Sequence, residues 1–139
     1  AALAPGVPAE PEAHARVAQL LAGALADVAP VAIAAVEAFE RLGGTLPLAP
    51  VRSVIGHPDP EVVQSAVRCL ARHGGEDDLQ ALLPLLAHPH WAVRAGVIQA
   101  FADRRLRSAL PPVLRRLECE PDEFVRDVLL RALARLEEA

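Results

Sequence analysis

The sequence has no lysine and no methionine among its 139 residues, and it has only two cysteines. All 14 basic residues are therefore arginine, which, with the abundant alanine and proline, is typical of GC-rich bacterial coding and indicates no function by itself. Because methionine is absent, we expect a chain that starts after its natural initiator, either processed or cut from a larger bacterial protein. Two thiols do not make a disulfide framework, so we expect Cys69 and Cys119 to be reduced in a cytoplasmic setting.

Long apolar runs and an excess of positive charge are missing too. No stretch approaches the roughly 20 apolar residues of a membrane span, so we expect no membrane partner. The formal net charge of −4 disfavours a nucleic-acid binder, whose affinity comes from clustered cations. The opening residues lack the pattern of a signal peptide, and their proline and alanine content predicts a linker or tail over residues 1–11. Residues 12–139 are long enough for one folded domain.

The apolar residues of the sequence recur in an internal repeat with a period of 31 residues. Val62, Ala66, Cys69 and Leu70 have the i, i+4, i+7, i+8 spacing of one helix face, and these positions stay apolar when shifted by −31, +31 or +63. The predicted helices, which we call A-type, contain residues 31–39, 62–70, 93–101 and 125–133. We expect matching interior positions for Val31, Val62, Val93 and Val125.

A second apolar stripe, with i, i+3, i+4, i+7 spacing, recurs between the A-type helices, and among its 16 positions only Arg52 is polar. The helices it predicts, which we call B-type, contain residues 17–24, 48–55, 79–86 and 110–117. No segment shows the period-2 alternation of a strand, so the predicted fold class is all-α. Asp59, Ser108 and Asp122 have the positions of helix caps, and Pro84 should kink its B-type helix or mark a later start.

Residues 59–75, DPEVVQSAVRCLARHGG, resemble the first helix of a HEAT repeat, whose usual pattern is Asp-Pro-x-Val-Arg-x-x-Ala-x-x-Ala-Leu-Gly. Val63 departs from the usual Arg, and the next copy keeps Val-Arg but begins His-Trp. The short period is similar to that of bacterial HEAT-like repeats of the phycocyanobilin-lyase type. The resemblance covers roughly residues 15–138. It implies a HEAT-like α-solenoid, a right-handed superhelix of about four antiparallel helix pairs with the B-type helices on its concave side. The residues that match the pattern are Asp59, Pro60, Val62, Ala66, Leu70 and Gly74.

The B-type positions opposite the apolar stripe are mostly small and apolar, which suits a partner peptide or helix laid along a concave groove. The alternative is that GC-rich coding fills neutral positions with alanine and proline. Trp91, at the start of an A-type helix, is interpreted either as an exposed anchor or as a residue packed under the preceding loop. The candidate partner-binding residues are Gln19, Ser53, Val54, His57, Ala81, Leu85, His88, Trp91, Arg115 and Arg116.

The last A-type helix is a second candidate surface. Leu130 is equivalent to Val36, Val67 and Ile98, which lie on the flank that should face the next repeat. We therefore expect the helix to present Val128 and Leu130 to a partner, to a second copy in a homodimer, or to the remainder of a longer chain.

No catalytic or metal constellation emerges. His57 and His88 occupy equivalent positions and His90 adds a third imidazole, but a zinc site needs three or four convergent ligands, and His-Pro is also typical of a turn between repeats. The iron hydroxylases of HEAT-like fold use His-Glu pairs, and no His-Glu dipeptide occurs here. We expect no metal, no cofactor and no enzymatic activity.

Five arginines, between Arg104 and Arg116, could line a DNA-binding face like that of HEAT-fold glycosylases. Carboxylates follow them at once, so an ion-paired surface is favoured and a nucleic-acid partner is disfavoured. The sequence therefore predicts a non-enzymatic interaction or scaffold module for a protein or peptide. The alternative is a HEAT-like lyase or an accessory of a nucleic-acid-binding enzyme.

Overall fold

The computed structural model describes residues 10–42 and 47–138, apart from the side chains of residues 10–12 and 14. These residues form helices and no strand, which confirms the all-α prediction. The α-helices are α1 (Glu10–Leu25), α2 (Ala29–Leu42), α3 (Ala49–Ser53), α4 (Pro60–His73), α5 (Glu76–Gln80), α6 (Trp91–Asp103), α7 (Leu110–Cys119) and α8 (Glu123–Glu138). The 3-10 helices are η2 (Val54–Gly56), η3 (Leu83–Ala87) and η4 (Arg107–Ala109).

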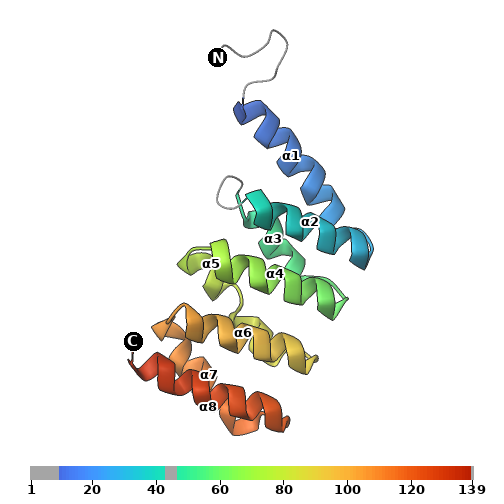
Figure 1. The fold of residues 1–139 in the computed structure, drawn as a ribbon. Coiled ribbons are helices and arrows are strands. Elements are labelled where there is room, and N and C mark those ends of the chain that lie inside the picture. Colours follow the sequence, from blue (N-terminus) through green and yellow to red (C-terminus); the bar gives the residue numbers. More distant parts are fainter. Residues whose placement is uncertain (1–9, 43–46, 139) are drawn as a thin grey trace.

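The A-type helices α2, α4, α6 and α8 stack in chain order and run in the same direction (Figure 1). The B-type elements are α1, α3 with η2, α5 with η3, and α7 after η4. Each B-type element precedes its A-type helix, so the chain is an α-solenoid with α1 at one end and α8 at the other (Figure 1). An elongated stack of this kind exposes a large surface for its length, because each repeat contacts only its neighbours.

The predicted helix boundaries follow from local hydrogen bonds, with one exception. The carboxylate of Asp59 accepts a hydrogen bond from the backbone N–H of Glu61 at 2.8 Å, and Asp122 accepts one from Val125 at 3.0 Å, so both are caps as predicted. The prediction for Ser108 is wrong, because η4 precedes α7 and α7 begins at Leu110 without a side-chain cap.

The core consists of matching positions from successive repeats. Val62, Val93 and Val125 are fully buried, as the repeat predicts. Leu114 of the last B-type stripe is exposed, against the prediction. The prediction is also wrong for Val17, Leu20 and Val31 of the first repeat, which are exposed because no described repeat packs on their outer side. The missing neighbour, and not the residue type, explains their exposure.

The B-type elements of the second and third repeats are not continuous α-helices. Each is one short α-helix followed by a 3-10 helix, and Pro84 lies in the first turn of η3, where its missing N–H is tolerated. A 3-10 helix has 3.0 residues per turn, so each residue advances further around the axis than in an α-helix. That extra rotation turns Val54 and Leu85 into the core, where both are buried. The prediction that these two side chains line a partner-binding surface is therefore wrong.

Candidate functional site

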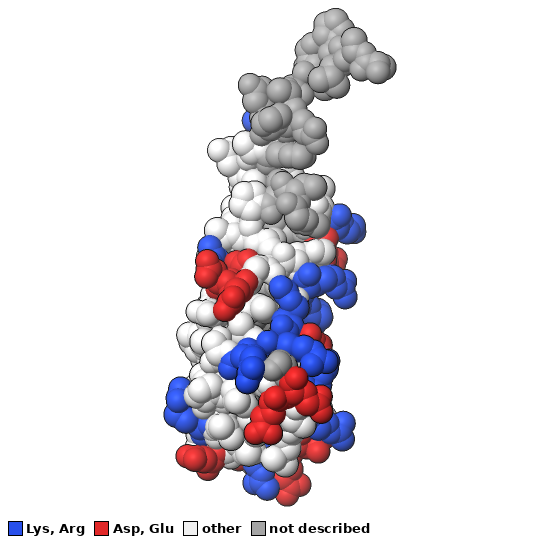
Figure 2. All heavy atoms as spheres, turned by 90° about the vertical axis from the view of Figure 1, so that its left-hand side faces the viewer, with Lys and Arg blue, Asp and Glu red and all other residues white. Residues whose placement is uncertain are grey.

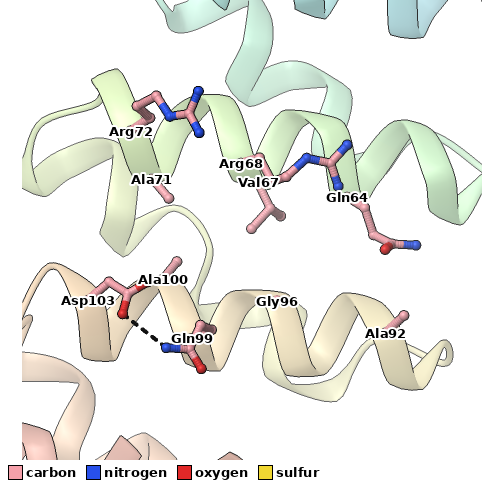
Figure 3. Close-up of a pocket in the computed structure, with 10 residues that line it drawn as sticks. All are labelled: Gln64, Val67, Arg68, Ala71, Arg72, Ala92, Gly96, Gln99, Ala100 and Asp103. Carbon is pink, nitrogen blue, oxygen red and sulfur yellow. Dashed lines mark hydrogen bonds between the residues drawn. The ribbon is translucent and has the colours of Figure 1, made fainter.

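A groove of about 390 Å³ lies between the neighbouring A-type helices α4 and α6. Its floor is made of small or apolar residues, and its rims carry amides and charges (Figure 3). The floor residues recur every three or four positions, so each helix presents them as one strip. Among the residues that the structure describes, no serine, cysteine or histidine lines the groove. The lining residues are Gln64, Val67, Arg68, Ala71, Arg72, Ala92, Gly96, Gln99, Ala100 and Asp103.

Gly96 is the residue that opens the groove. It lies in the middle of α6, where glycine costs about 1 kcal/mol of stability relative to alanine. A Cβ atom added at Gly96 would meet no heavy atom within 4 Å, so packing does not require a glycine there. The equivalent residue of α4, Ser65, is buried. The backbone of α6 is therefore accessible to a ligand at the one point where the groove has no side chain.

The electrostatics of the two rims differ. On α4, the guanidinium of Arg72 points away from α6 and pairs with Glu40 of α2 at 2.9 Å (Figure 3). On α6, the carboxylate of Asp103 accepts hydrogen bonds from Gln99 at 2.9 Å and from Arg135 at 2.7 Å.

Arg68 is the remaining charge. Its guanidinium makes only a 3.4 Å contact with the hydroxyl of Ser65 and, within the described residues, has no carboxylate partner. The groove thus combines an apolar floor, two amides at its edges and one guanidinium that has no carboxylate partner among the described residues.

A family model for HEAT repeats matches residues 17–90 and again residues 80–139. The chain belongs to the HEAT-repeat family. No curated protein and no solved structure matches it. HEAT repeats are generally protein-interaction scaffolds.

The HEAT-repeat residues predicted to bind a partner on the B-type elements do not line this groove. Gln19, Ser53 and Arg115 are exposed, and His57, Ala81, His88 and Arg116 are partly buried, so these seven side chains reach solvent. Val54 and Leu85 do not. The groove lies instead on the face formed by the A-type helices, which the sequence interpretation had assigned to the outside of the solenoid.

The histidines close turns between HEAT repeats. The ring Nδ1 of His57 accepts the backbone N–H of Asp59 at 3.0 Å, and Nδ1 of His88 accepts that of His90 at 3.0 Å. His90 in turn replaces the usual aspartate as the cap of α6 by accepting the N–H of Ala92 at 3.1 Å. Among the described residues, no group of three or more His, Cys, Asp or Glu side chains could hold a metal ion.

Trp91 is 47% exposed, and its ring stacks on that of His90 in the preceding turn, with 6.0 Å between the ring centroids. Its ring meets Phe124 of α8 edge to face, with 5.5 Å between the ring centroids. Phe124 is exposed as well and was not singled out from the sequence. Its position corresponds to Ala92 of α6, so the signal in the sequence was a large aromatic residue where another repeat has alanine. The pair forms a small aromatic ridge at the end of the molecule where α6 and α8 begin.

The arginine-rich segment does not form a continuous cationic stripe. Arg104 donates to the carbonyls of Ala71 and Gly74 at 2.7 and 2.8 Å, and Arg116 pairs with Glu120 at 3.1 Å. On the side where the A-type helices end, basic and acidic side chains lie next to one another (Figure 2). Arg105 and Arg107 line a separate groove with Arg104, and Glu76 adds a carboxylate to that lining.

Two further observations bear on the setting of the protein. No helix among the described residues combines the length and the apolarity that crossing a membrane requires. Cys69 is fully buried, as its alignment with alanines of other repeats predicts, and burial raises the pKa of its thiol to about 11. Cys69 is therefore an unreactive core residue.

Proposed function

We propose that this HEAT-repeat chain is a non-enzymatic protein-interaction module and that the α4–α6 groove receives a short segment of the partner. The open backbone at Gly96 is the observation that carries the proposal. A helix interior that keeps a glycine without a steric need accepts a stability cost of about 1 kcal/mol, and a closely approaching ligand backbone accounts for that cost.

The groove also suggests what the partner segment is like. The floor of Val67, Ala71 and Ala100 suits small apolar side chains, and Gln64 and Gln99 can exchange hydrogen bonds with a peptide backbone. A carboxylate on the segment would pair with Arg68, whose charge has no carboxylate partner among the described residues. The proposed partner is therefore a protein with an exposed, weakly acidic and otherwise apolar segment. The bacterial and cytoplasmic setting inferred from arginine usage and the free thiols is part of the same proposal.

A displayed library of random 12-residue peptides tests the groove. Gly96→Leu places a branched side chain over the floor, and we expect selected peptides to bind this variant at least 10-fold more weakly than the original chain. Arg68→Glu should weaken mainly the peptides that contain aspartate or glutamate, because it replaces attraction by repulsion.

Gly56→Leu is the matched control. Gly56 also has open space around its Cβ position, but it lies in η2 on a B-type element, away from the groove. We expect this variant to bind like the original chain. Peptides that tolerate Gly96→Leu but not Gly56→Leu would reject the groove and favour the B-type surface predicted from the sequence.

A further inference from the structure

A second groove, of about 400 Å³, lies beyond the C-terminal end of α6. Its lining consists of Glu76 and Leu79 of α5 and of residues 104–108, which lead from the end of α6 into η4. We call it the arginine groove, because Arg104, Arg105 and Arg107 all line it. It shares no lining residue with the α4–α6 groove, so an inference about its ligand is independent of the proposed function.

The three arginines of this groove lack acidic partners. Among the described residues, Arg104, Arg105 and Arg107 take part in no ion pair, whereas six other arginines of the chain each pair with a carboxylate. Glu76 is the one carboxylate in the described lining, and it accepts only a 3.4 Å hydrogen bond from Gln80. The guanidinium groups in the lining therefore exceed the carboxylates by two charges.

The guanidinium of Arg104 is held in a fixed position. Its two terminal nitrogens donate to the backbone carbonyls of Ala71 and Gly74, at 2.7 and 2.8 Å, where α4 ends. These acceptors carry no formal charge, and the negative end of a helix dipole offsets only about half an elementary charge. Arg104 therefore keeps a positive charge beside the groove and loses little freedom when an anion binds.

Arg105 occupies a backbone position that ordinarily takes glycine. Its φ is 51°, its N–H donates to the carbonyl of Ala102 at 3.1 Å, and the N–H of Leu106 donates to that of Phe101 at 3.0 Å. These two bonds end α6 in a Schellman motif, in which glycine is usual because other side chains are strained at a positive φ. The chain keeps an arginine here at a cost in stability, and residues retained under such strain often have a function.

The positive charge is confined to a small area. Figure 2 shows basic side chains gathered over the middle of the side on which the A-type helices end, with acidic side chains next to them. A nucleic-acid backbone needs cations along an extended stripe, so this cluster matches a single anionic group instead. A phosphate monoester carries a charge of about −1.5 to −2 at pH 7 and offers three strong acceptor oxygens.

We propose that the arginine groove binds a phosphate monoester. Arg105 and Arg107 pair with the phosphate oxygens, and Arg104 adds a fixed positive charge. The exposed hydroxyl of Ser108, which makes no hydrogen bond with another described residue, donates to the same group. A volume of about 400 Å³ also leaves room for the small molecule or the phosphorylated side chain that carries the phosphate.

NMR titrations of the isotope-labelled chain, in a buffer without phosphate, test the proposal. The probes are inorganic phosphate and a peptide without other charges, acetyl-Gly-Gly-phosphoserine-Gly-Gly-amide, with serine and aspartate versions as control peptides. We expect saturable shifts in the amides of residues 76–79 and 104–108. The phosphopeptide should bind about 10-fold more tightly than the aspartate peptide, because it brings more charge and more acceptors.

The two probes distinguish the sources of the phosphate. Tighter binding of the phosphopeptide than of inorganic phosphate would assign the groove to a phosphorylated side chain of a partner protein. Equal or tighter binding of inorganic phosphate would assign it to a small phosphorylated molecule.

Variants of the lining separate binding from folding. Arg105→Gly and Arg107→Gln should each weaken phosphate binding about 10-fold, since each removes a charged donor. Arg105→Gly also removes the strain at φ 51°, so binding should fall although the unfolding free energy in urea does not. Glu76→Gln removes the carboxylate of the lining and should tighten binding. Arg126→Gln, an exposed change on α8 outside the groove, is the matched control and should bind like the original chain.

Four results would overturn the proposal. The first is that neither probe gives a saturable shift, and the second is that the aspartate peptide binds as tightly as the phosphopeptide. The third is that Arg126→Gln weakens binding as much as Arg107→Gln does, which would show diffuse attraction between charges. The fourth is that Arg107→Gln lowers the unfolding free energy and leaves phosphate binding unchanged, because the arginines would then serve only to stabilise the ends of α4 and α6.

Discussion

Removing the carboxylate of Glu120 is expected to destabilise the protein more than any surface substitution. Glu120 follows α7, is 4% exposed, and accepts four hydrogen bonds. Arg94 of α6 donates two of them, at 2.8 and 2.9 Å, Arg116 donates one at 3.1 Å, and the backbone N–H of Asp122 donates one at 3.0 Å. Arg94 is itself only 6% exposed and also donates to the carbonyls of His88 and Pro89.

The size of the effect follows from the charge that is left behind. Glu120→Ala leaves the guanidinium of Arg94 buried without a counter-charge, which costs about 3–5 kcal/mol. For a chain of this length that loss lowers Tm by about 10–17 °C. The double variant Arg94→Met/Glu120→Leu removes both charges, and we expect its stability to lie within about 1 kcal/mol of the original.

Urea unfolding followed by circular dichroism measures all three proteins, and its pH dependence adds a second check. Burial alone would raise the pKa of Glu120, but the hydrogen bonds from Arg94, Asp122 and Arg116 together hold it below the ordinary 4.5. A carboxyl with a lowered pKa in the fold stabilises the protein above pH 4.5, and this contribution is lost as the pH falls through the folded value. Below pH 4.5, the unfolding free energy of the original chain should therefore fall relative to that of the double variant. A Glu120→Ala variant within 1 kcal/mol of the original at pH 7 would refute the reasoning.

Four further predictions concern single positions. Arg105 has a φ of 51° just after α6 ends, a backbone conformation that glycine adopts without strain. Arg105→Gly should therefore raise the unfolding free energy measured in urea by about 0.5–1 kcal/mol. A lower unfolding free energy would show that the arginine side chain contributes more than the backbone strain costs. Gly96→Ala should raise the unfolding free energy by about 0.5–1 kcal/mol, because the added methyl group meets open space, and no gain would mean that the helix interior is already strained there. Asp59→Ala should lower the unfolding free energy by about 1 kcal/mol because it removes the cap of α4. Asp59→Asn should retain most of the capping stabilisation, because its side-chain oxygen can still accept the hydrogen bond. Burial, with His90 and Arg94 nearby, lowers the pKa of His88 below 6.5, so the ring should titrate below that value in an NMR pH series. The fold favours the neutral ring, so the contribution of His88 to the unfolding free energy should be lost as the pH falls through the folded pKa.

The repeat in the sequence predicted most of the fold because it follows from one physical requirement. Each helix pair must bury its apolar stripe against the next, so the positions of Val62, Val93 and Val125 could be found by shifting the numbering. The same procedure misplaced Val31 and Leu20, since a periodic pattern carries no information about where the stack ends. It also misplaced Val54 and Leu85, because a change from α to 3-10 winding alters the residue period within a single element.

The candidate site was harder to predict than the fold. The α4–α6 groove is formed by the absence of side chains, and a single glycine in an alanine-rich helix is a weak sequence signal. The pair between Arg94 and Glu120 was also missed, because Glu120 stands in an acidic run that is typical of a solvated loop. The useful signal was Arg94 itself, a charged residue beside a buried position of the repeat, which requires a counter-charge from the following repeat.

The most direct test of the account is a chemical-shift map of the isotope-labelled chain with the tightest peptide from the displayed library. The α4–α6 groove predicts that the perturbed amides cluster in residues 64–72 and 92–103, on the two facing helices that line it. Perturbations confined to the B-type elements, around Ser53, Ala81 and His88, would contradict it.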